Sequence, residues 1–385
     1  MKKNIVYWIV LPMIILSTGT VCSCGDDEAA QAALEQENAP IVVMVDADGK
    51  ADGGHSFTKI DDEHFYIDNI LYTAKNDTLS VTGFDKEHFD GIVNIISQLN
   101  YDGRTMPVTS IGNRAFLNSR ESETNSFVDL SRSYNKITSL TIPESVTSIG
   151  ESAFSCCQGL KSVIIPPGVK VIPNLAFFGC EDLTTIRLPE GLTEIGDAAF
   201  FECKALTSIQ IPDNVKKIGD GAFRRCTSIT SIHIPKAVEN IEPRSFMECP
   251  VLTTIIVDKD NKTYDSRENC NAIVETDKNK IVFAIPTSKI PFSITAIGDY
   301  AFFGPEDCTS VTIPSNVEEI GLYAFAMYLN LEDVYCYAEE PPHCIGGSPF
   351  DFHTYERATL HVPASAVNSY TYDYWCYFKK IVAIE

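Results

Sequence analysis

The chain has 385 residues, of which 44% are hydrophobic and 21% are charged, and its formal net charge is −22 at pH 7. So acidic a protein repels phosphate backbones and anionic lipid headgroups, which excludes nucleic acid and the membrane surface as partners. The length also exceeds what one compact core usually serves, whereas an array of repeats escapes that limit because each unit packs only on its neighbours.

The first 23 residues predict an export signal that is removed. Two lysines precede a 12-residue apolar run, Ile5–Leu16, which is too short to cross a hydrocarbon core of about 30 Å as a helix. The run and the cysteines after it resemble a bacterial lipoprotein signal, in which a Cys that follows a small residue receives lipid. The small residues on both sides of Cys24 favour lipidation of this residue, and ordinary cleavage without lipid is the alternative.

Residues 24–40 predict a flexible tether, because this acidic, Ala- and Gln-rich stretch has too little apolar surface to fold. The acidic residues directly after Cys24 resemble the surface-export signal of lipoproteins in some anaerobic Gram-negative bacteria. This resemblance implies an outer-membrane protein that contacts the membrane through its lipid alone and faces outward, with an anchor facing the periplasm as the alternative. Loss of residues 1–23 takes the net charge from −22 to −24.

Residues 41–105 predict an N-terminal cap that is rich in hairpins. Apolar and polar residues alternate in short segments such as His64–Ile70 and Thr78–Thr82, which is the period of a half-buried strand. An array of repeats exposes apolar faces at both ends, so an atypical covering unit is needed at each end for solubility.

Residues 106–335 repeat with a period of 23. Ile-Pro or Leu-Pro pairs recur at this step and end at Pro143, Pro166, Pro189, Pro212 and Pro235. Ala-Phe pairs, with one Ser-Phe, keep the same step at Phe154, Phe177, Phe200, Phe223 and Phe246, and a further two follow at Phe302 and Phe325. A period of 20–29 residues with the pattern L-x-x-L-x-L is the signature of leucine-rich repeats.

Each repeat predicts a short strand, a proline stop and a helical turn. In one copy the core pattern is Leu206, Ile209 and Ile211, whose last two members alternate with a polar residue and therefore point inward. Proline ends the strand because it lacks the N–H that the ladder needs. A second apolar pair, Val215 and Ile218, leads into the Ala-Phe segment. The fold class is a β-rich (α+β) leucine-rich-repeat solenoid of 23-residue coils, with short stacked strands and single helical turns, capped at both ends.

The unit Leu206–Cys226, LTSIQIPDNVKKIGDGAFRRC, resembles the BspA-like class of bacterial leucine-rich repeats. A long insertion at 257–291 resembles the family's longer repeat variant, in which a hairpin interrupts the coils. Residues 336–385 depart from the repeat and predict a C-terminal cap. The resemblance implies a surface lipoprotein or adhesin that binds a host or bacterial protein, with no catalytic site.

Comparison of the repeats separates positions that the stack dictates from positions that it leaves free. One strand column keeps a small hydroxyl, as expected where stacked hydroxyls bond along the ladder: Ser139, Ser162, Thr185, Ser208, Ser231, Thr254 and Ser310. Two residues later the side chain varies: Thr141, Ile164, Arg187, Gln210, His233, Ile256, Thr312 and Tyr335. This sheet face is commonly the concave binding side of leucine-rich repeats. The candidate ligand contacts are therefore Arg187, Gln210, His233 and Tyr335, and an ordinary solvated surface is the alternative.

Two further columns follow the repeated Phe. The position directly after it predicts additional core rather than an exposed apolar stripe, at Ser155, Phe178, Phe201, Arg224, Met247, Phe303 and Ala326. Three residues after the Phe stand Cys157, Cys180, Cys203, Cys226 and Cys249. Stacked coils place these thiols within reach of disulfide formation, but five thiols in one column cannot all pair, so we expect buried free thiols.

The sequence carries no P-loop, G-x-S-x-G elbow, H-E-x-x-H or C-x-x-C motif. Its C-terminal His and Cys residues follow none of the usual zinc spacings: Cys336, His343, Cys344, His353 and His361. A calcium-like start at Asp46 fails because Ala51 replaces the turn glycine. We therefore expect neither an enzyme nor a bound metal or cofactor.

The predicted function is that of a monomeric cell-surface lipoprotein, which acts as a non-catalytic binding or adhesion module for a protein or glycan ligand. A structural envelope protein without a specific ligand is the alternative, and an enzyme within either end segment is a third reading.

Overall fold

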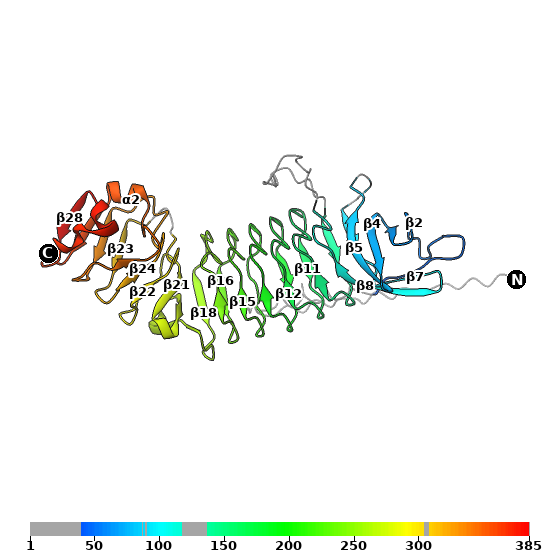
Figure 1. Ribbon diagram of the computed structural model, residues 1–385, viewed down its shortest axis with the longest axis horizontal. Coiled ribbons are helices and arrows are strands. Elements are labelled where there is room, and N and C mark those ends of the chain that lie inside the picture. Colours follow the sequence, from blue (N-terminus) through cyan, green and yellow to red (C-terminus); the bar gives the residue numbers. More distant parts are fainter. Residues whose placement is uncertain (1–39, 87, 89–90, 118–136, 304–307, 385) are drawn as a thin grey trace, which may run out of the picture. The chain divides into compact units, whose positions relative to one another are not determined.

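The computed structural model describes residues 40–86, 88, 91–117, 137–303 and 308–384. The predicted signal peptide, Cys24 and the tether as far as residue 39 lie outside the described residues. The architecture of the described chain is a stack of coils between two end segments (Figure 1).

Eight strands form one sheet at the N-terminal end. Their bounds are β1 (Val42–Met44), β2 (Phe57–Lys59), β3 (His64–Ile67), β4 (Ile70–Lys75), β5 (Thr78–Phe84), β7 (Gln98–Tyr101), β8 (Arg104–Ile111) and β10 (Ser148–Ile149). Strands β2 to β5 pair antiparallel as successive hairpins, whereas β8 pairs in parallel with β5 and with β10. Since β10 belongs to the coil that contains Phe154, β8 joins the N-terminal hairpins to the repeats.

Most coils then contribute a short strand to what we call the first ladder, and the coil of Gln210 has no assigned strand at this position. Its members are β6 (Ile92–Asn94), β9 (Ser139–Thr141), β11 (Ser162–Ile164), β13 (Thr185–Arg187), β16 (Ser231–Ile234), β18 (Thr254–Val257), β23 (Ser310–Ile313), β25 (Asp333–Cys336), β27 (Thr359–Val362) and β28 (Lys380–Ala383). Pairing is parallel and in register, so that Val163 faces Ile186 and Ile232 faces Ile255. These four residues are buried, and their strand neighbours point outward because side chains alternate along a strand.

A second ladder of two-residue strands follows the proline in most coils. After β10 come β12 (Val171–Ile172), β14 (Glu194–Ile195), β15 (Lys217–Ile218), β17 (Asn240–Ile241), β22 (Ala296–Ile297), β24 (Glu319–Ile320) and β26 (His343–Cys344). From β12 to β17, and from β22 to β24, the strands pair in parallel with the same 23-residue offset, and the isoleucine of each strand is buried. Strand β26 follows β24 at an offset of 24 and has the buried Cys344 at the equivalent position.

The segment around each Ala-Phe pair consists of consecutive hydrogen-bonded turns that bond from coil to coil. The N–H of Phe177 donates to the carbonyl of Ala199 at 2.9 Å, and the N–H of Phe200 donates to that of Ala222 at 2.8 Å. Non-glycine residues adopt positive φ at repeated positions of this segment, such as Glu202 at 57°. Left-handed backbone is costly for such residues, and the bonds between coils hold it in place.

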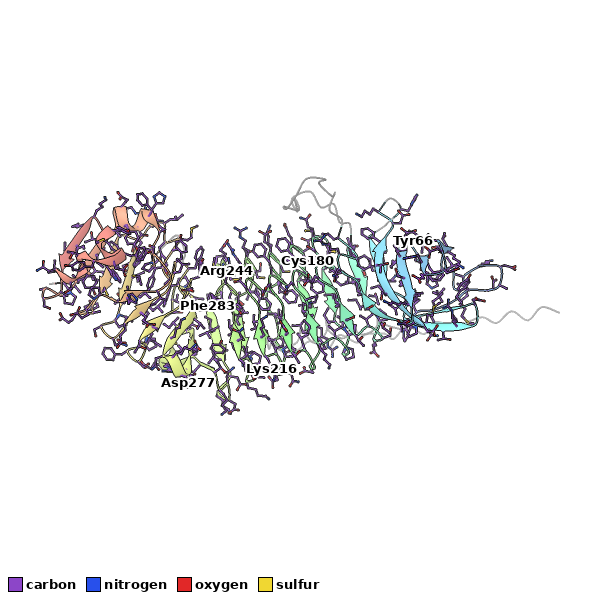
Figure 2. All side chains as sticks on the ribbon, in the orientation of Figure 1. Tyr66, Cys180, Lys216, Arg244, Asp277 and Phe283 are labelled. Atoms are coloured by element: carbon purple, nitrogen blue, oxygen red, sulfur yellow. The ribbon has the colours of Figure 1, made fainter. Side chains whose placement is uncertain are left out.

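The repeated phenylalanines stack into a continuous spine in the core. Phe177 and Phe200 have ring centroids 5.6 Å apart and planes within 4°, which confirms that residues one period apart lie over each other. The spine continues through Phe246 to Phe283 of the insertion, labelled in Figure 2, at 5.5 Å. Stacked and edge-on rings are favourable at such distances, and these rings are buried, so the spine is a main contributor to stability.

The predicted insertion forms an antiparallel unit within the stack. Its elements are β19 (Tyr264–Asp265), the 3-10 turn η2 (Arg267–Asn269), β20 (Ala272–Glu275), the 3-10 turn η3 (Thr276–Lys278) and β21 (Lys280–Ala284). Strand β20 pairs antiparallel with β21, and β21 pairs in parallel with β22. The hairpin therefore continues the second ladder while the first ladder is interrupted between β18 and β23.

Aromatic side chains cover the last coils. This end contains α2 (Phe352–Arg357), the 3-10 turns η4 (Ser369–Thr371) and η5 (Asp373–Tyr377), and strand β28. Trp375 is buried and donates from its indole N–H to the carbonyl of Pro342 at 2.8 Å, and Tyr370 donates to the carbonyl of Ala338 at 2.9 Å. Each buried ring thus has its polar group satisfied, as stable burial requires.

Candidate binding face

Three of the four candidate contacts lie in successive coils on the outward side of the first ladder, which we call the open face. Arg187 ends β13 and is exposed, and its register partner in β11 is Ile164. His233 in β16 is exposed and pairs with Ile256 of β18. Gln210 is exposed between them, in a segment that is not assigned as strand. The variable column therefore forms one row on a regular backbone.

The fourth candidate belongs to a separate part of the open face. Tyr335 lies in β25, beyond the insertion, and its ring stacks on that of His361 in β27 at 4.3 Å and 17°. The His361 imidazole is hydrogen-bonded to the Asp333 carboxylate at 2.7 Å. The structure therefore groups Tyr335 with His361 and Asp333 rather than with the other three candidates.

His361 is a member of the row that the sequence comparison missed. It follows Tyr335 by 26 residues rather than 23, because α2 lengthens this coil. The segment Thr359–Pro363 nevertheless repeats the pattern in which polar and apolar residues alternate and proline follows. This pattern could have identified His361 as a member of the row.

Hydroxyl side chains form hydrogen bonds along the first ladder, but they belong to the position one residue before the predicted column of Ser and Thr. Thr184 Oγ1 donates to the carbonyl of Lys161 at 3.0 Å, and Thr253 Oγ1 donates to that of Thr230 at 3.3 Å. The predicted column, including Ser162 and Ser208, is half-buried or exposed beside the variable row.

The column after the repeated Phe is only partly core. Ser155, Met247 and Ala326 are buried as predicted, but Phe178, Phe201, Arg224 and Phe303 are half-buried. The rings of Phe178 and Phe201 stack at 4.9 Å, and the guanidinium of Arg224 lies 5.7 Å from the Phe201 ring. A guanidinium above the face of an aromatic ring is attracted to it. Arg224 therefore covers part of the half-buried Phe201 ring.

Ion pairs join the coils on this turn side. Glu248 accepts hydrogen bonds from Arg225 at 2.5 Å and from Arg224. Burial raises the pKa of Glu248, but the hydrogen bonds from the two arginines outweigh it, so that the net pKa lies below the usual value.

The cysteine column consists of free thiols that donate to the preceding coil. Cys180, Cys203 and Cys226 are fully buried, and Cys249 is half-buried. Cys203 Sγ donates to the carbonyl of Phe177 at 3.3 Å, and Cys226 Sγ to that of Phe200 at 3.1 Å. Burial raises the pKa of the Cys203 and Cys226 thiols well above the usual value. These thiols therefore act as compact hydrophobic residues that also bond to the backbone.

Among the residues that the structure describes, no three His, Cys, Asp or Glu side chains gather closely enough to hold a metal ion. Every helix of the described ranges is too short or too polar to span a membrane.

The repeat, the two ladders and the phenylalanine spine agree with one family. The sequence matches the BspA type leucine rich repeat region in six copies, over residues 123–253 and 282–382. The chain belongs to the BspA-type leucine-rich-repeat family. The match confirms the resemblance inferred from the repeat unit, together with the solenoid fold class.

Solved structures share the fold of this BspA-type protein. A leucine rich cell surface protein from Faecalibacterium prausnitzii is 24% identical with a TM-score of 0.56, and the match covers 86% of this chain and 95% of that one. A leucine-rich repeat protein from Bacteroides ovatus is 26% identical with a TM-score of 0.51, covering 83% and 82%. The pneumococcal vaccine antigen PcpA is 18% identical with a TM-score of 0.61, covering 81% and 82%. No curated protein matches the chain.

Proposed function

We propose that this BspA-type protein is a cell-surface binding module, which captures a protein or glycan ligand through its open face without catalysing a reaction. The observation that carries the proposal is the contrast between two kinds of column. Inward positions such as Ile186 and Ile232 stay aliphatic, while Arg187, Gln210 and His233 differ from coil to coil and are exposed. A stack that needs only its inward columns leaves this row available for recognition.

Two proteins with the same fold support the location. One is a leucine rich cell surface protein and another is a vaccine antigen. Anchoring through lipid on Cys24, in the outer membrane and facing outward, belongs to the same proposal. Labelling of growing cells with radioactive palmitate is expected to mark the protein, and Cys24→Ala is expected to abolish the label while Cys22→Ala preserves it. Label retained in Cys24→Ala would overturn the anchor assignment.

The open face is tested with a triple variant, Arg187→Ala, Gln210→Ala and His233→Ala, in the soluble form that starts at residue 25. The wild type is immobilised and screened against host matrix proteins, bacterial surface proteins and polysaccharides. Any saturable ligand is expected to lose most of its affinity for the triple variant. Exposed substitutions usually change stability by no more than about 0.5 kcal/mol, so the thermal melt is expected to stay nearly constant.

The control is a second triple variant near the second ladder, with exposed side chains of similar size: Lys170→Ala, Lys216→Ala and Glu239→Ala. It is expected to bind like the wild type. Equal binding by wild type and open-face variant would remove the site assignment, and the absence of any saturable ligand would favour a structural envelope protein.

A further inference from the structure

The insertion leaves one strand of the first ladder with a free edge inside the array. Strand β18 pairs with β16 on one side, and the next member of the ladder, β23, belongs to another sheet. Toward β16, the N–H of Thr254 donates to the carbonyl of Thr230 at 3.3 Å, and the N–H of Asp258 donates to the carbonyl of Ile234 at 2.9 Å. Because a parallel strand directs alternate residues to its two neighbours, the backbone N–H and C=O groups of Ile255 and Val257 face away from β16.

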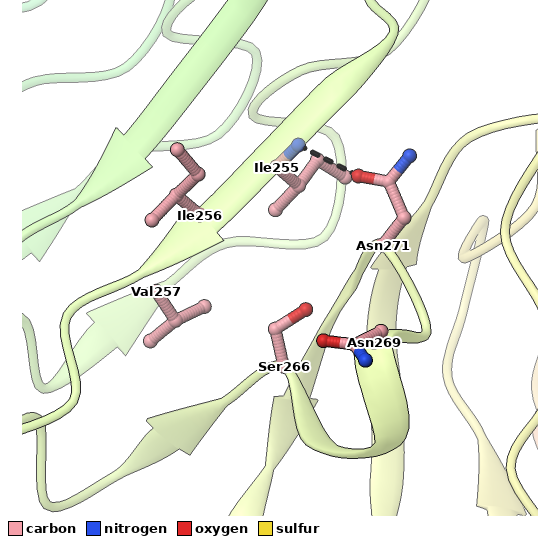
Figure 3. Close-up of a pocket in the computed structure, with 6 residues that line it drawn as sticks. All are labelled: Ile255, Ile256, Val257, Ser266, Asn269 and Asn271. Carbon is pink, nitrogen blue, oxygen red and sulfur yellow. Dashed lines mark hydrogen bonds between the residues drawn. The ribbon is translucent and has the colours of Figure 1, made fainter.

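The side chain of Asn271 takes the place of one missing strand residue at this edge. Its Oδ1 accepts from the N–H of Ile255 at 2.8 Å, as Figure 3 shows, and its Nδ2 donates to the carbonyl of Thr253 at 2.8 Å. The carboxamide thereby satisfies one donor and one acceptor that a neighbouring strand would otherwise pair. Asn271 itself has φ of 56°, a conformation that Asn tolerates better than most residues.

The C=O of Ile255 and the N–H of Val257 come next along this edge. They face a hollow of about 320 Å³ (Figure 3). The hollow is lined by Ile255, Ile256, Val257, Ser266, Asn269 and Asn271. By the alternation along the strand, the N–H of Val257 points away from β16, and no described strand pairs with β18 on that side. An unpaired N–H and C=O on a strand edge form a template for another extended chain.

The lining indicates the chemistry of an occupant. It contains hydroxyl, carboxamide and aliphatic groups and no charged side chain or aromatic ring. A peptide group is a neutral donor and acceptor pair, so it matches the unpaired edge without placing a charge in the hollow. Beside the lining in sequence stand Asp258 and Glu268, and also Arg267, whose guanidinium is ion-paired with Asp265 at 2.6 Å. With that pair neutralised the remaining charge is acidic, which favours a guest with basic rather than acidic flanking side chains.

We propose that the hollow receives an extended peptide segment of a partner protein, which adds to the free edge of β18. One guest residue donates its N–H to the carbonyl of Ile255 and accepts from the N–H of Val257. The opposite edge of the guest meets Ser266 Oγ and the Asn269 carboxamide. A guest side chain covers Ile256, which is 51% exposed and is the register neighbour of His233. Main-chain pairing gives such a complex its affinity, and the row of open-face side chains gives it specificity.

The inference rests on the proposed function and names its partner class as protein. The probe is a phage-displayed library of random octapeptides, selected on the immobilised soluble protein, and the selected peptides are synthesised and titrated by fluorescence anisotropy. We expect peptides rich in Lys or Arg. Methylation of a single peptide N–H is expected to weaken binding about tenfold, because the bond to the Ile255 carbonyl is lost. The Val257 amide is expected to exchange with deuterium rapidly in the free protein and slowly in the complex.

The variant Ser266→Phe fills the hollow and is expected to weaken peptide binding at least about tenfold. The control Ser315→Phe places the same ring on an exposed turn and is expected to bind like the wild type. Should Ser266→Phe fold poorly in circular dichroism, Asn269→Gly removes the carboxamide, keeps a residue suited to φ of 52°, and is expected to weaken binding several-fold.

Two outcomes overturn the peptide assignment. Either no peptide is selected, which leaves a hollow filled by water only, or the selected peptides bind Ser266→Phe normally and leave Val257 unprotected. A glycan that loses affinity for the open-face triple variant but not for Ser266→Phe would keep the proposed function and remove this inference alone.

Discussion

The phenylalanine spine predicts a large loss of stability when one ring is removed. Phe200 is fully buried, with Phe177 at 5.6 Å on one side and Phe223 at 5.4 Å on the other, and the planes agree within 11°. Phe200→Ala removes a ring that touches both neighbouring coils, so the surrounding backbone, held by bonds to both coils, can collapse into the cavity only in part.

The expected cost of Phe200→Ala is about 4 kcal/mol, within the range of about 3–5 kcal/mol for buried Phe→Ala substitutions. Two stacked pairs are lost, each worth about 0.5–1.5 kcal/mol beyond the burial of area. Phe200→Leu keeps most of the volume and is expected to cost about 1–2 kcal/mol. The matched control is the adjacent Phe201→Ala, whose ring is half-buried and stacks on Phe178 alone, and it is expected to cost about 1–2 kcal/mol.

Urea unfolding followed by circular dichroism measures these differences. In an array whose units depend on their neighbours, a defect in the middle coil also separates the coils on its two sides, so the m-value of Phe200→Ala is expected to fall as the two parts unfold separately. Equal free energies of unfolding for Phe200→Ala and Phe201→Ala, within about 0.5 kcal/mol, would refute the spine as the main stabilising element.

Three other predictions address the ion pairs, the thiols and the insertion. Since the pKa of Glu248 is lowered in the folded state by its bonds to Arg225, its contribution is present above the unfolded pKa and is lost as the pH falls through the folded one. The free energy of unfolding is therefore expected to fall less between pH 5 and pH 3 in Glu248→Gln than in the wild type, and an unchanged slope would contradict this. Iodoacetamide at pH 8 is expected to modify the exposed Cys376 in the native protein and Cys226 only after unfolding, as read by mass spectrometry; native labelling of Cys226 would count against the buried column. Asn271→Ala is expected to cost about 1–3 kcal/mol in urea unfolding, because it removes two bonds to the edge of β18, and a change below about 0.5 kcal/mol would argue against its role there.

The sequence predicted the features that one period determines. A fixed step of 23 residues requires equal positions to stack, and this single condition led to the phenylalanine spine, the buried thiols and the placement of Arg187 and His233 on one outward row. Inward and outward positions followed from alternation along each strand. These predictions succeeded because every contact involved repeats at a constant sequence distance.

Features that depend on a change of period were harder to foresee. The period of 23 does not align His361 with Tyr335, because the coil of His361 is three residues longer. The period also groups Tyr335 with the other three candidates, because it does not show that the insertion interrupts the first ladder between β18 and β23. The half-buried rings of Phe178 and Phe201 are covered by an arginine whose position varies between repeats, so hydrophobicity alone suggested more core than the structure contains. The positive φ of residues such as Glu202 could not be predicted from the sequence, because these positions do not carry glycine, the residue that usually marks such a conformation.

The hollow beside β18 shows why a regular array benefits from one irregularity. Where the strands of the regular coils pair, as β11 with β13 and β16 with β18, their backbone groups bond to each other and the row of Arg187 and His233 offers side chains to a ligand. The hairpin β20–β21 continues the second ladder but withdraws a strand from the first, and Asn271 repairs only part of the edge that this creates. Side-chain recognition and backbone recognition are thereby placed next to each other at Ile256, where separate variants can test them separately. A partner that used both would lose affinity in the open-face triple variant and in Ser266→Phe, and the two losses would multiply if the contacts are independent.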